Sequence, residues 1–138
     1  MSSPNLDLVR LINLAHERGD FSSIAWADSE IVYVIADGPS PGRWTGPEAM
    51  AAGFRENLIG WKDFRTEVEE YRELDEERVL VLTRSTAQGK AGGLVVGQMR
   101  TKGAVLYHLS GGKVTRLVYY WDRERALADV GLRLDEAC

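Results

Sequence analysis

Residues 93–132 read GLVVGQMRTKGAVLYHLSGGKVTRLVYYWDRERALADVGL, and this stretch decides the fold class. It begins with a long alternating run, Leu94 to Leu109, which predicts a strand long enough to bend. The next four residues, Ser110 to Lys113, have the composition of a hairpin turn, and Val114 to Trp121 predicts the returning strand. Asp122 is placed to cap a closing helix. The pattern indicates a curved antiparallel sheet that is able to enclose a pocket.

The chain upstream of this stretch predicts helices followed by further strands. Ser3 is placed to cap a helix that begins at Pro4 and that Gly19 ends. The other predicted elements are a short helix from Asp20 through Ile24, Ala25 and Trp26, a buried strand at 31–35, a helix after the capping-box pair Thr45 and Glu48, and strands at 63–74 and 79–87. We therefore predict one α+β domain over residues 1–138, with helices first and a mostly antiparallel sheet after them.

Alternation assigns the side chains of the long strand to two faces. One face is expected to carry Val95, Met99, Val105, Tyr107 and Leu109, and the other Gln98, Arg100, Lys102, Leu106 and His108. On the last strand, Leu117, Tyr119 and Trp121 share a face, which we assign to the interior with the first set. Gly97 and Gly103 are candidate sites for a bulge or bend. If the sheet curls over the helices, the interior is apolar and aromatic with tyrosine hydroxyls as its polar groups, as in many small-molecule sites. Alternatively, both tyrosines are ordinary core residues with satisfied hydroxyls.

Composition narrows the class of protein. The chain has 138 residues, of which 44% are hydrophobic and 28% charged, as in ordinary globular proteins. A net charge of −4 at pH 7, without a basic stripe, argues against nucleic-acid binding. No apolar run approaches the roughly 20 residues of a membrane span. The N-terminal residues lack the pattern of a secretory signal, and the single cysteine, Cys138, can form neither an internal disulfide nor a Cys/His metal cluster. We expect a cytoplasmic protein without metal, cofactor, nucleic-acid partner or membrane partner.

The order of elements and several short motifs resemble the SnoaL-like branch of the nuclear transport factor 2-like superfamily. The motifs are Gly19-Asp20-Phe21, Gly46-Pro47-Glu48-Ala49-Met50, Ser110-Gly111-Gly112-Lys113-Val114, Tyr120-Trp121-Asp122-Arg123 and the tail through Gly131-Leu132, so the resemblance covers nearly the whole chain. It implies a cone, in which a strongly curved sheet packs on N-terminal helices around a pocket. It also implies dimers joined through the outer face of the sheet. This fold hosts isomerases, cyclases, epoxide hydrolases, dehydratases and binding domains, so the resemblance does not name a reaction.

The catalytic groups of those relatives are missing at the matching positions. Steroid isomerases of this fold use an Asp base together with a Tyr and a protonated Asp that polarise the carbonyl. The matching positions here are the apolar Val34, Ile12 and Val105. Epoxide hydrolases of this fold need an Arg-x-Asp spacing, where this chain has Arg100-Thr101-Lys102, and Tyr119 stands near the place of their last-strand acid. Polyketide cyclases of this branch use an acid–base Asp, and no inward-facing Asp is predicted here.

Two functions remain from the sequence. The first is a domain that binds a small hydrophobic molecule without chemistry, with Tyr107, Tyr119, Met99, Trp121, Trp26 and Phe54 as ligand-binding residues. The second is an enzyme of the polyketide cyclase, isomerase or dehydratase type that uses Tyr107 and Tyr119, supported by Arg84 or His108. A tyrosine with an ordinary pKa of about 10 donates well to an oxyanion but is a poor base at neutral pH. We expect no ionisable group at the centre of the interior.

The two histidines and the apolar residues of the outer face are interpreted as structural residues. His108 is predicted on the outer face, and His16 lies in the last turns of the first helix, where a cation suits the helix dipole. A pure dimerisation module is a third possible function. Leu106, Val118 and Tyr120 share the outer face among polar neighbours, and such an apolar strip predicts a homodimer.

Overall fold

The computed structural model describes the backbone of residues 3–18, 20, 24–37, 41–58, 61–91 and 94–131. It describes the side chains of the same residues except 57, 58, 61–64, 88–91 and 94–100. Within these ranges the elements follow in the order α1 (Pro4–Glu17), β1 (Ala27–Ile35), β2 (Gly42–Thr45), α2 (Pro47–Leu58), β3 (Trp61–Glu73), β4 (Arg78–Ala91), β5 (Leu94–Ser110), β6 (Lys113–Tyr120) and α3 (Arg123–Asp129).

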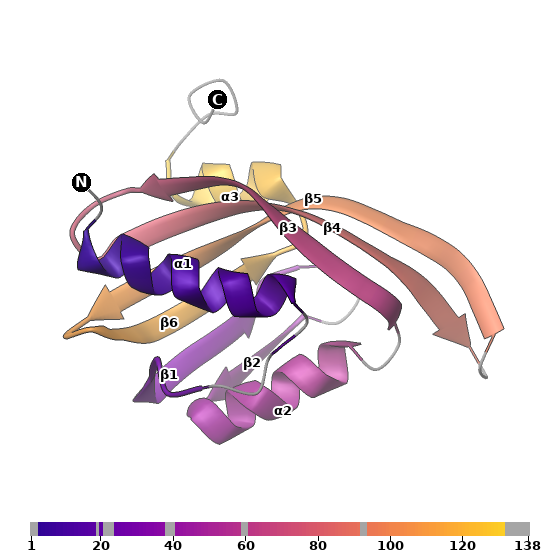
Figure 1. The fold of residues 1–138 in the computed structure, drawn as a ribbon, viewed down its shortest axis with the longest axis horizontal. Helices are drawn as coiled ribbons and strands as arrows, with labels where there is room; N and C mark the ends of the chain where they lie inside the picture. The colour runs from indigo at the N-terminus through magenta and orange to yellow at the C-terminus, as the bar shows by residue number, and fades with distance from the viewer. Residues whose placement is uncertain are drawn as a thin grey trace.

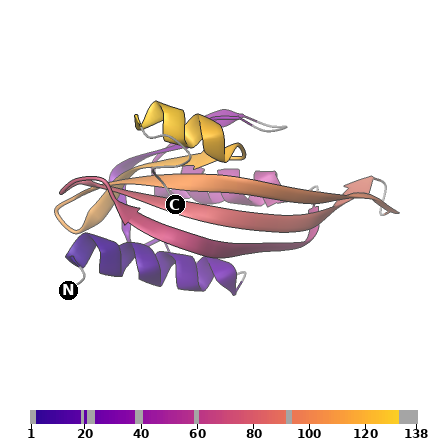
Figure 2. The ribbon, with the colours of Figure 1, turned by 90° about the horizontal axis from the view of Figure 1, so that it is seen from above.

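The strands form one mixed sheet in the order β2-β1-β6-β5-β4-β3. β1 runs parallel to β6, and the other neighbouring pairs are antiparallel. Helices α1 and α2 cover one face, which we call the inner face, and α3 lies on the opposite, outer face (Figure 1). Figure 2 shows the sheet passing between α1 and α3. The α+β class predicted from the sequence, with a long antiparallel meander after the first helices, is confirmed.

Local signals set the ends of these elements as the sequence predicts. The Ser3 side chain accepts a hydrogen bond from an amide in the first turn of α1, and Pro4 begins the helix where no amide is needed. Asp122 caps α3 in the same way. Gly111 and Gly112 have φ angles of 59° and 77°, in the left-handed region that a tight hairpin turn between β5 and β6 requires.

The sheet carries a separate apolar core on each face. The inner core joins α1 and α2 to the strands and includes Val9, Ile12, Tyr33, Met50, Phe54, Val81, Val105, Tyr107 and Leu117. The outer core lies under α3 and consists of Leu80, Leu82, Ala104, Leu106, Val118, Tyr120, Ala126 and Leu127. Neighbours in sequence such as Leu106 and Tyr107 fall in different cores, so the predicted alternation of faces is confirmed on β6 and on β5 from Ala104 onward, whereas the side chains of 94–100 lie outside the described residues.

Gly103 marks the point where β6 ends and the other long strands continue. A Cβ atom at this position would lie 2.4 Å from the carbonyl oxygen of Tyr120, so only glycine fits. Beyond it, β3, β4 and β5 extend together as a three-stranded arm (Figure 1). The register is regular at Gly103, whereas the irregularity predicted at Gly97 is confirmed, because the β4–β5 register shifts immediately beside the pair of Gly89 and Gly97.

One local prediction near the N-terminus is wrong. Ala25 and Trp26 form a turn and not a helix, and β1 begins directly after them at Ala27. The short strand β2 is an element that the sequence does not predict, because its tetrapeptide Gly42–Thr45 has no recognisable alternation. Within the described ranges, no helix is long and apolar enough to cross a membrane.

The apolar strip from which we predicted a homodimer is covered by the chain itself. Leu106, Val118 and Tyr120 are 6%, 6% and 4% exposed, because they pack in the outer core with Ala126 and Leu127 of α3. The premise that this strip needs a second copy to cover it is therefore wrong. A homodimer stays a prediction, without support from these three residues.

Candidate functional site

Aromatic rings gather on the inner face of the sheet. Tyr33 on β1 stacks on Trp44 of β2 with ring centroids 5.3 Å apart, and it meets Phe54 of α2 edge-on at 4.7 Å. Such ring pairs contribute about 0.5–1.5 kcal/mol each beyond the burial of their area. Four further rings pack on the same core, and we call the whole set the aromatic wall: Trp26, Tyr33, Trp44, Phe54, Tyr107, Tyr119 and Trp121.

Glycines hold one ring of the wall in place. A Cβ atom at Gly53 of α2 would lie 2.8 Å from the Trp44 ring, and one at Gly42 would lie 2.7 Å from the same ring. Real Cβ atoms do not approach an aromatic ring so closely. The indole of Trp44 therefore fills the space that these two glycines leave, and this fixes its stacking on Tyr33.

Tyr107 is the most deeply buried polar group of the wall, at 1% exposure. Its hydroxyl accepts a hydrogen bond of 3.1 Å from Nδ2 of Asn13, which also donates to the carbonyl of Val9 at 2.8 Å. Burial raises the pKa of Tyr107, and the hydrogen bond from Asn13 opposes this. Because the hydroxyl accepts from Asn13, its own hydrogen is available to a ligand. Sequence reasoning missed Asn13, although it follows Val9 by one turn on the buried face of α1.

Tyr119 belongs to a row of hydroxyl groups farther along the strands. Register places Thr66, Ser85 and Thr101 opposite one another on β3, β4 and β5. Ser85 Oγ donates to Thr66 Oγ1 at 3.1 Å. Burial raises the pKa of Tyr119 and the Ser85 hydroxyl acts to lower it, so the Tyr119 hydroxyl is neutral at ordinary pH. The row adds a polar end to the aromatic wall.

Thr83 carries another buried hydroxyl group on the inner face. Thr83 is 2% exposed, and its Oγ1 has no hydrogen-bond partner among the groups that the structure describes. It shares its side of β4 with Ser85, two residues on. Strand parity could have identified both, since they continue the alternation of Val79 and Val81.

His16 lies against the aromatic wall from α1. Its ring meets Trp26 edge-on at 6.3 Å and Phe54 at 5.9 Å between centroids. Burial lowers the pKa of His16 to about 4, and the charge of Asp20 opposes this only in part. The ring is therefore neutral at neutral pH, and the expectation of a cation that suits the helix dipole is wrong. The expectation of no ionisable group at the centre of the interior stays a prediction, since His16 is partly exposed and lies in the last turn of α1.

The other residues predicted to bind a ligand divide into two groups. Phe54, Trp26 and Trp121 are members of the aromatic wall, as expected. Met99 pairs with Ala87 through the backbone, but its side chain lies outside the described residues. Within the described part of the chain, no three His, Cys, Asp or Glu side chains come together as a metal site.

The two residues named as support for an enzyme lie away from the wall. Arg84 is more than half exposed and forms an ion pair with Glu67 at 2.7 Å. His108 lies on the outer face, opposite Tyr107, as predicted, and lines a groove with Arg78 and Arg116. Neither side chain can act on a molecule held against the inner face.

The positions matched to steroid isomerases need one correction. Ile12 and Val105 are in the inner core, but Val34 packs against the outer core, so a base at that position would face away from the site. The inward residues of β1 are Ile31, Tyr33 and Ile35. Burial raises the pKa of Tyr33, so none of the three is a base at neutral pH.

Comparison with known proteins identifies the fold. No protein-family model and no curated protein sequence matches the chain. A nuclear transport factor 2-like protein of unknown function from Burkholderia pseudomallei K96243 superposes with a TM-score of 0.75 at 20% identity, over 92% of this chain and 97% of that one. TerC, co-crystallized with polyporic acid, superposes with a TM-score of 0.72 at 16% identity, over 93% and 98%. A candidate SnoaL-like polyketide cyclase from Jannaschia sp. CCS1 has a TM-score of 0.69 at 15% identity, over 84% and 83%.

These identities are too low to carry a function from one protein to another, because the same fold supports many activities. The superpositions, each over more than four fifths of this chain, agree with the fold that the sequence predicts. The chain therefore has the nuclear transport factor 2-like fold, of which SnoaL-like proteins are one branch.

Proposed function

We propose that the protein binds a small, largely apolar ring molecule against the aromatic wall, oriented by the hydroxyls of Tyr107 and Tyr119. The observation that carries this proposal is the combination of many rings with a few buried hydroxyl groups on one face of the sheet. Small-molecule sites usually combine apolar walls with a small number of placed polar groups.

The buried hydroxyl groups distinguish a binding site from an ordinary core. A buried polar group that lacks a partner costs about 1–3 kcal/mol. Thr83 Oγ1 lacks a partner among the described groups, and the hydrogen of the Tyr107 hydroxyl remains to donate. A ligand with a carbonyl or hydroxyl group would satisfy them, so we infer a ring system that carries such groups. TerC, which shares the fold and was co-crystallized with polyporic acid, supports a role of this kind.

Fluorescence titration with a neutral apolar probe, N-phenyl-1-naphthylamine, tests the apolar part of the site, and 1-naphthol tests the hydroxyl groups. We expect saturable binding of both. Tyr107→Phe and Tyr119→Phe should each weaken the binding of 1-naphthol about fivefold, since a neutral hydrogen bond contributes roughly 1 kcal/mol. Both variants should bind N-phenyl-1-naphthylamine with nearly unchanged affinity, because they keep the aromatic rings.

Tyr120→Phe is the matched control, because Tyr120 follows Tyr119 on β6 but lies in the outer core. It should alter the binding of neither probe. Equal effects of all three substitutions, or no saturable binding by folded protein, would contradict the proposal. Native mass spectrometry of the purified protein would then identify the molecule that it carries.

A second candidate, an enzyme of the cyclase, isomerase or dehydratase type, is favoured by His16. Its neutral imidazole beside the aromatic wall supplies the base that the sequence did not reveal. A base whose conjugate acid has a pKa of about 4 is weak, however, since general bases work best with a pKa near the operating pH. Binding is therefore the better-supported function. An enzyme would lose turnover, and keep substrate binding, on His16→Gln.

A further inference from the structure

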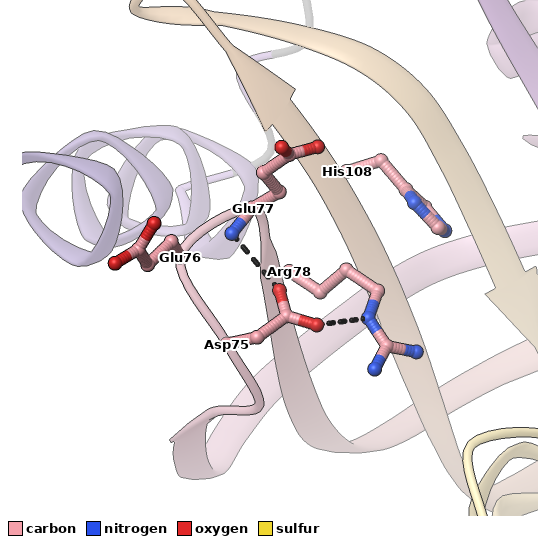
Figure 3. A pocket seen from close by; sticks show the side chains of 5 residues that line it. All are labelled: Asp75, Glu76, Glu77, Arg78 and His108. Atoms are coloured by element: carbon pink, nitrogen blue, oxygen red, sulfur yellow. Dashed lines mark hydrogen bonds and ion pairs between the residues drawn. The ribbon is translucent and has the colours of Figure 1, made fainter.

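A row of three basic side chains crosses the outer face of the sheet. Register pairs Arg78 of β4 with His108 of β5, and His108 with Arg116 of β6. Residues directly opposite each other on neighbouring strands have Cβ atoms about 4.5–5.5 Å apart. Figure 3 shows the side chains of Arg78 and His108 on the same side of the sheet. His108, whose pKa is lowered by burial and by the charges of both arginines, thus separates Arg78 from Arg116 in this row.

The row continues into a groove between the sheet and α3. The groove has a volume of about 480 Å³, and Arg125 of α3 lines it together with Arg78, His108 and Arg116. Leu106 and Val118 contribute an apolar floor. The groove therefore offers several guanidinium groups above a small apolar surface.

Only part of this positive charge is paired with a carboxylate among the described residues. Arg78 Nε donates to Asp75 at 2.8 Å, and in Figure 3 Asp75 faces it while Glu76 points away. Asp129 also lines the groove, and its carboxylate accepts a hydrogen bond of 2.9 Å from the Tyr120 hydroxyl. Among the described residues, no carboxylate lies within 4 Å of the guanidinium nitrogens of Arg116 or Arg125. Within the described part of the chain, Arg116 and Arg125 thus line the groove together with Asp129 but form no ion pair there, in a chain whose net charge is −4.

The electrostatics of the groove confirm that these groups lie near one another. The charges of Arg116 and Arg78 lower the pKa of His108, after burial as the main cause. The charges of Arg125 and Arg116 both act on Tyr120, whose pKa is raised to about 12 mainly by burial and by its bond to Asp129. The charge of Arg116 thus acts on both His108 and Tyr120, and the charge of Arg125 on α3 acts on Tyr120 as well.

We propose that this groove binds a small molecule that carries a phosphate or sulfate group, held between Arg116 and Arg125. The planar guanidinium fork forms two parallel hydrogen bonds with such an oxyanion. A dianion matches two unpaired cations better than a single carboxylate does. The apolar floor accepts the carbon part of the molecule. The site is on the opposite face of the sheet from the aromatic wall and does not depend on the function proposed for that wall.

Calorimetric titration of the full chain with sodium sulfate, and then with phenyl phosphate, tests the proposal at constant ionic strength. We expect saturable binding that weakens about tenfold or more in Arg116→Gln and in Arg125→Gln, since each loses a charge-assisted contact. Arg55→Gln is the matched control, because Arg55 is an exposed arginine on α2, across the sheet. It should bind like the wild type. Thermal melts of each variant establish that the fold is retained.

Acidification provides an independent readout. The charged groups that act on His108 are Arg78 on β4, Arg116 on β6, and Asp75 and Glu77 in the turn before β4. Sulfate keeps its charge down to about pH 5, whereas His108 gains a proton as the pH falls. Sulfate should therefore bind more tightly at about pH 5.5 than at about pH 7 in the wild type, and His108→Gln should lose this dependence.

Three outcomes would overturn the proposal. One is sulfate binding that Arg116→Gln and Arg125→Gln leave unchanged. Another is acetate binding as tightly as sulfate, which would remove the preference for a dianion. The third is binding to phosphatidylglycerol vesicles without binding to sulfate or phenyl phosphate, which would assign the groove to a membrane surface and not to a small molecule.

Discussion

Asn13 and Tyr107 meet inside the protein, where the amide of Asn13 donates a 3.1 Å hydrogen bond to the Tyr107 hydroxyl. The bond joins α1 to β5 across 94 positions of the sequence. It fixes the direction of the deepest hydroxyl on the aromatic wall. It also shows that the polar groups of the candidate site are positioned by contacts between layers.

Tyr107→Phe should lower the free energy of unfolding by about 1–2 kcal/mol, because one N–H of the buried Asn13 amide loses its acceptor. Urea denaturation of Tyr107→Phe, Asn13→Leu and the double variant measures the coupling. In the Asn13→Leu background the cost of Tyr107→Phe should fall toward zero. An equal cost in both backgrounds would show that the hydrogen bond does not contribute to stability.

Gly53→Ala should destabilise the protein, although alanine is the better helix former by about 1 kcal/mol. The added Cβ would lie 2.8 Å from the Trp44 ring, and overpacking of this kind costs about 1–3 kcal/mol. Trp44→Leu removes the obstacle, so in that background Gly53→Ala should be neutral or stabilising. Urea denaturation of the four proteins in this cycle gives the answer, and a gain in stability with Trp44 present would refute the argument.

Arg123→Met should cost about 2–4 kcal/mol, because its side chain is 14% exposed and binds three groups at once. It donates to the carbonyls of Thr83 and Gly103, beyond the end of β6, and forms an ion pair with Glu69. Arg123→Lys keeps the charge but not the fork, and should recover only part of the loss.

Arg84→Met is the control for Arg123, since Arg84 also has an ion pair but its side chain is 55% exposed. Solvent and salt screen an exposed ion pair, so this change should have little effect on thermal unfolding. Similar losses for the two arginines would mean that the carbonyl contacts of Arg123 are unimportant.

Most of the fold could be predicted because its signals are local. The alternation that separates Leu106 from Tyr107 depends only on the period of a strand. Ser3 and Asp122 mark helix starts through hydrogen bonds to amides in the first turn that follows. Gly111 and Gly112 supply the left-handed conformations of a hairpin within the turn itself.

The remaining features depend on contacts between residues that are far apart in the sequence, and a local sequence pattern does not reveal such contacts. Val34 is matched to the isomerase base by its distance along the sequence, but it packs against the outer core, and the pairing of β1 with β6 shifts in register between Ala27 and Val32. His16 was placed at a solvated helix end, because nothing near it in sequence announces that Trp26 and Phe54 pack around it. The Arg78–His108–Arg116 row likewise becomes visible only when the register of three strands is known.

His16 makes the stability of the protein sensitive to acid. Its pKa is about 4 in the folded protein and 6.5 when unperturbed, so below pH 6.5 the unfolded chain binds a proton that the folded chain does not. Stability from this source is complete above about pH 6.5 and is lost as the pH falls toward 4, by roughly 3 kcal/mol in total. His16→Leu cannot bind this proton, so it should lose less stability than the wild type between about pH 7 and about pH 4.5. Urea denaturation at the two pH values measures the difference, in which the contributions of the carboxylates cancel. An NMR titration of the His16 ring with a midpoint near 6.5 would contradict its burial against Trp26 and Phe54.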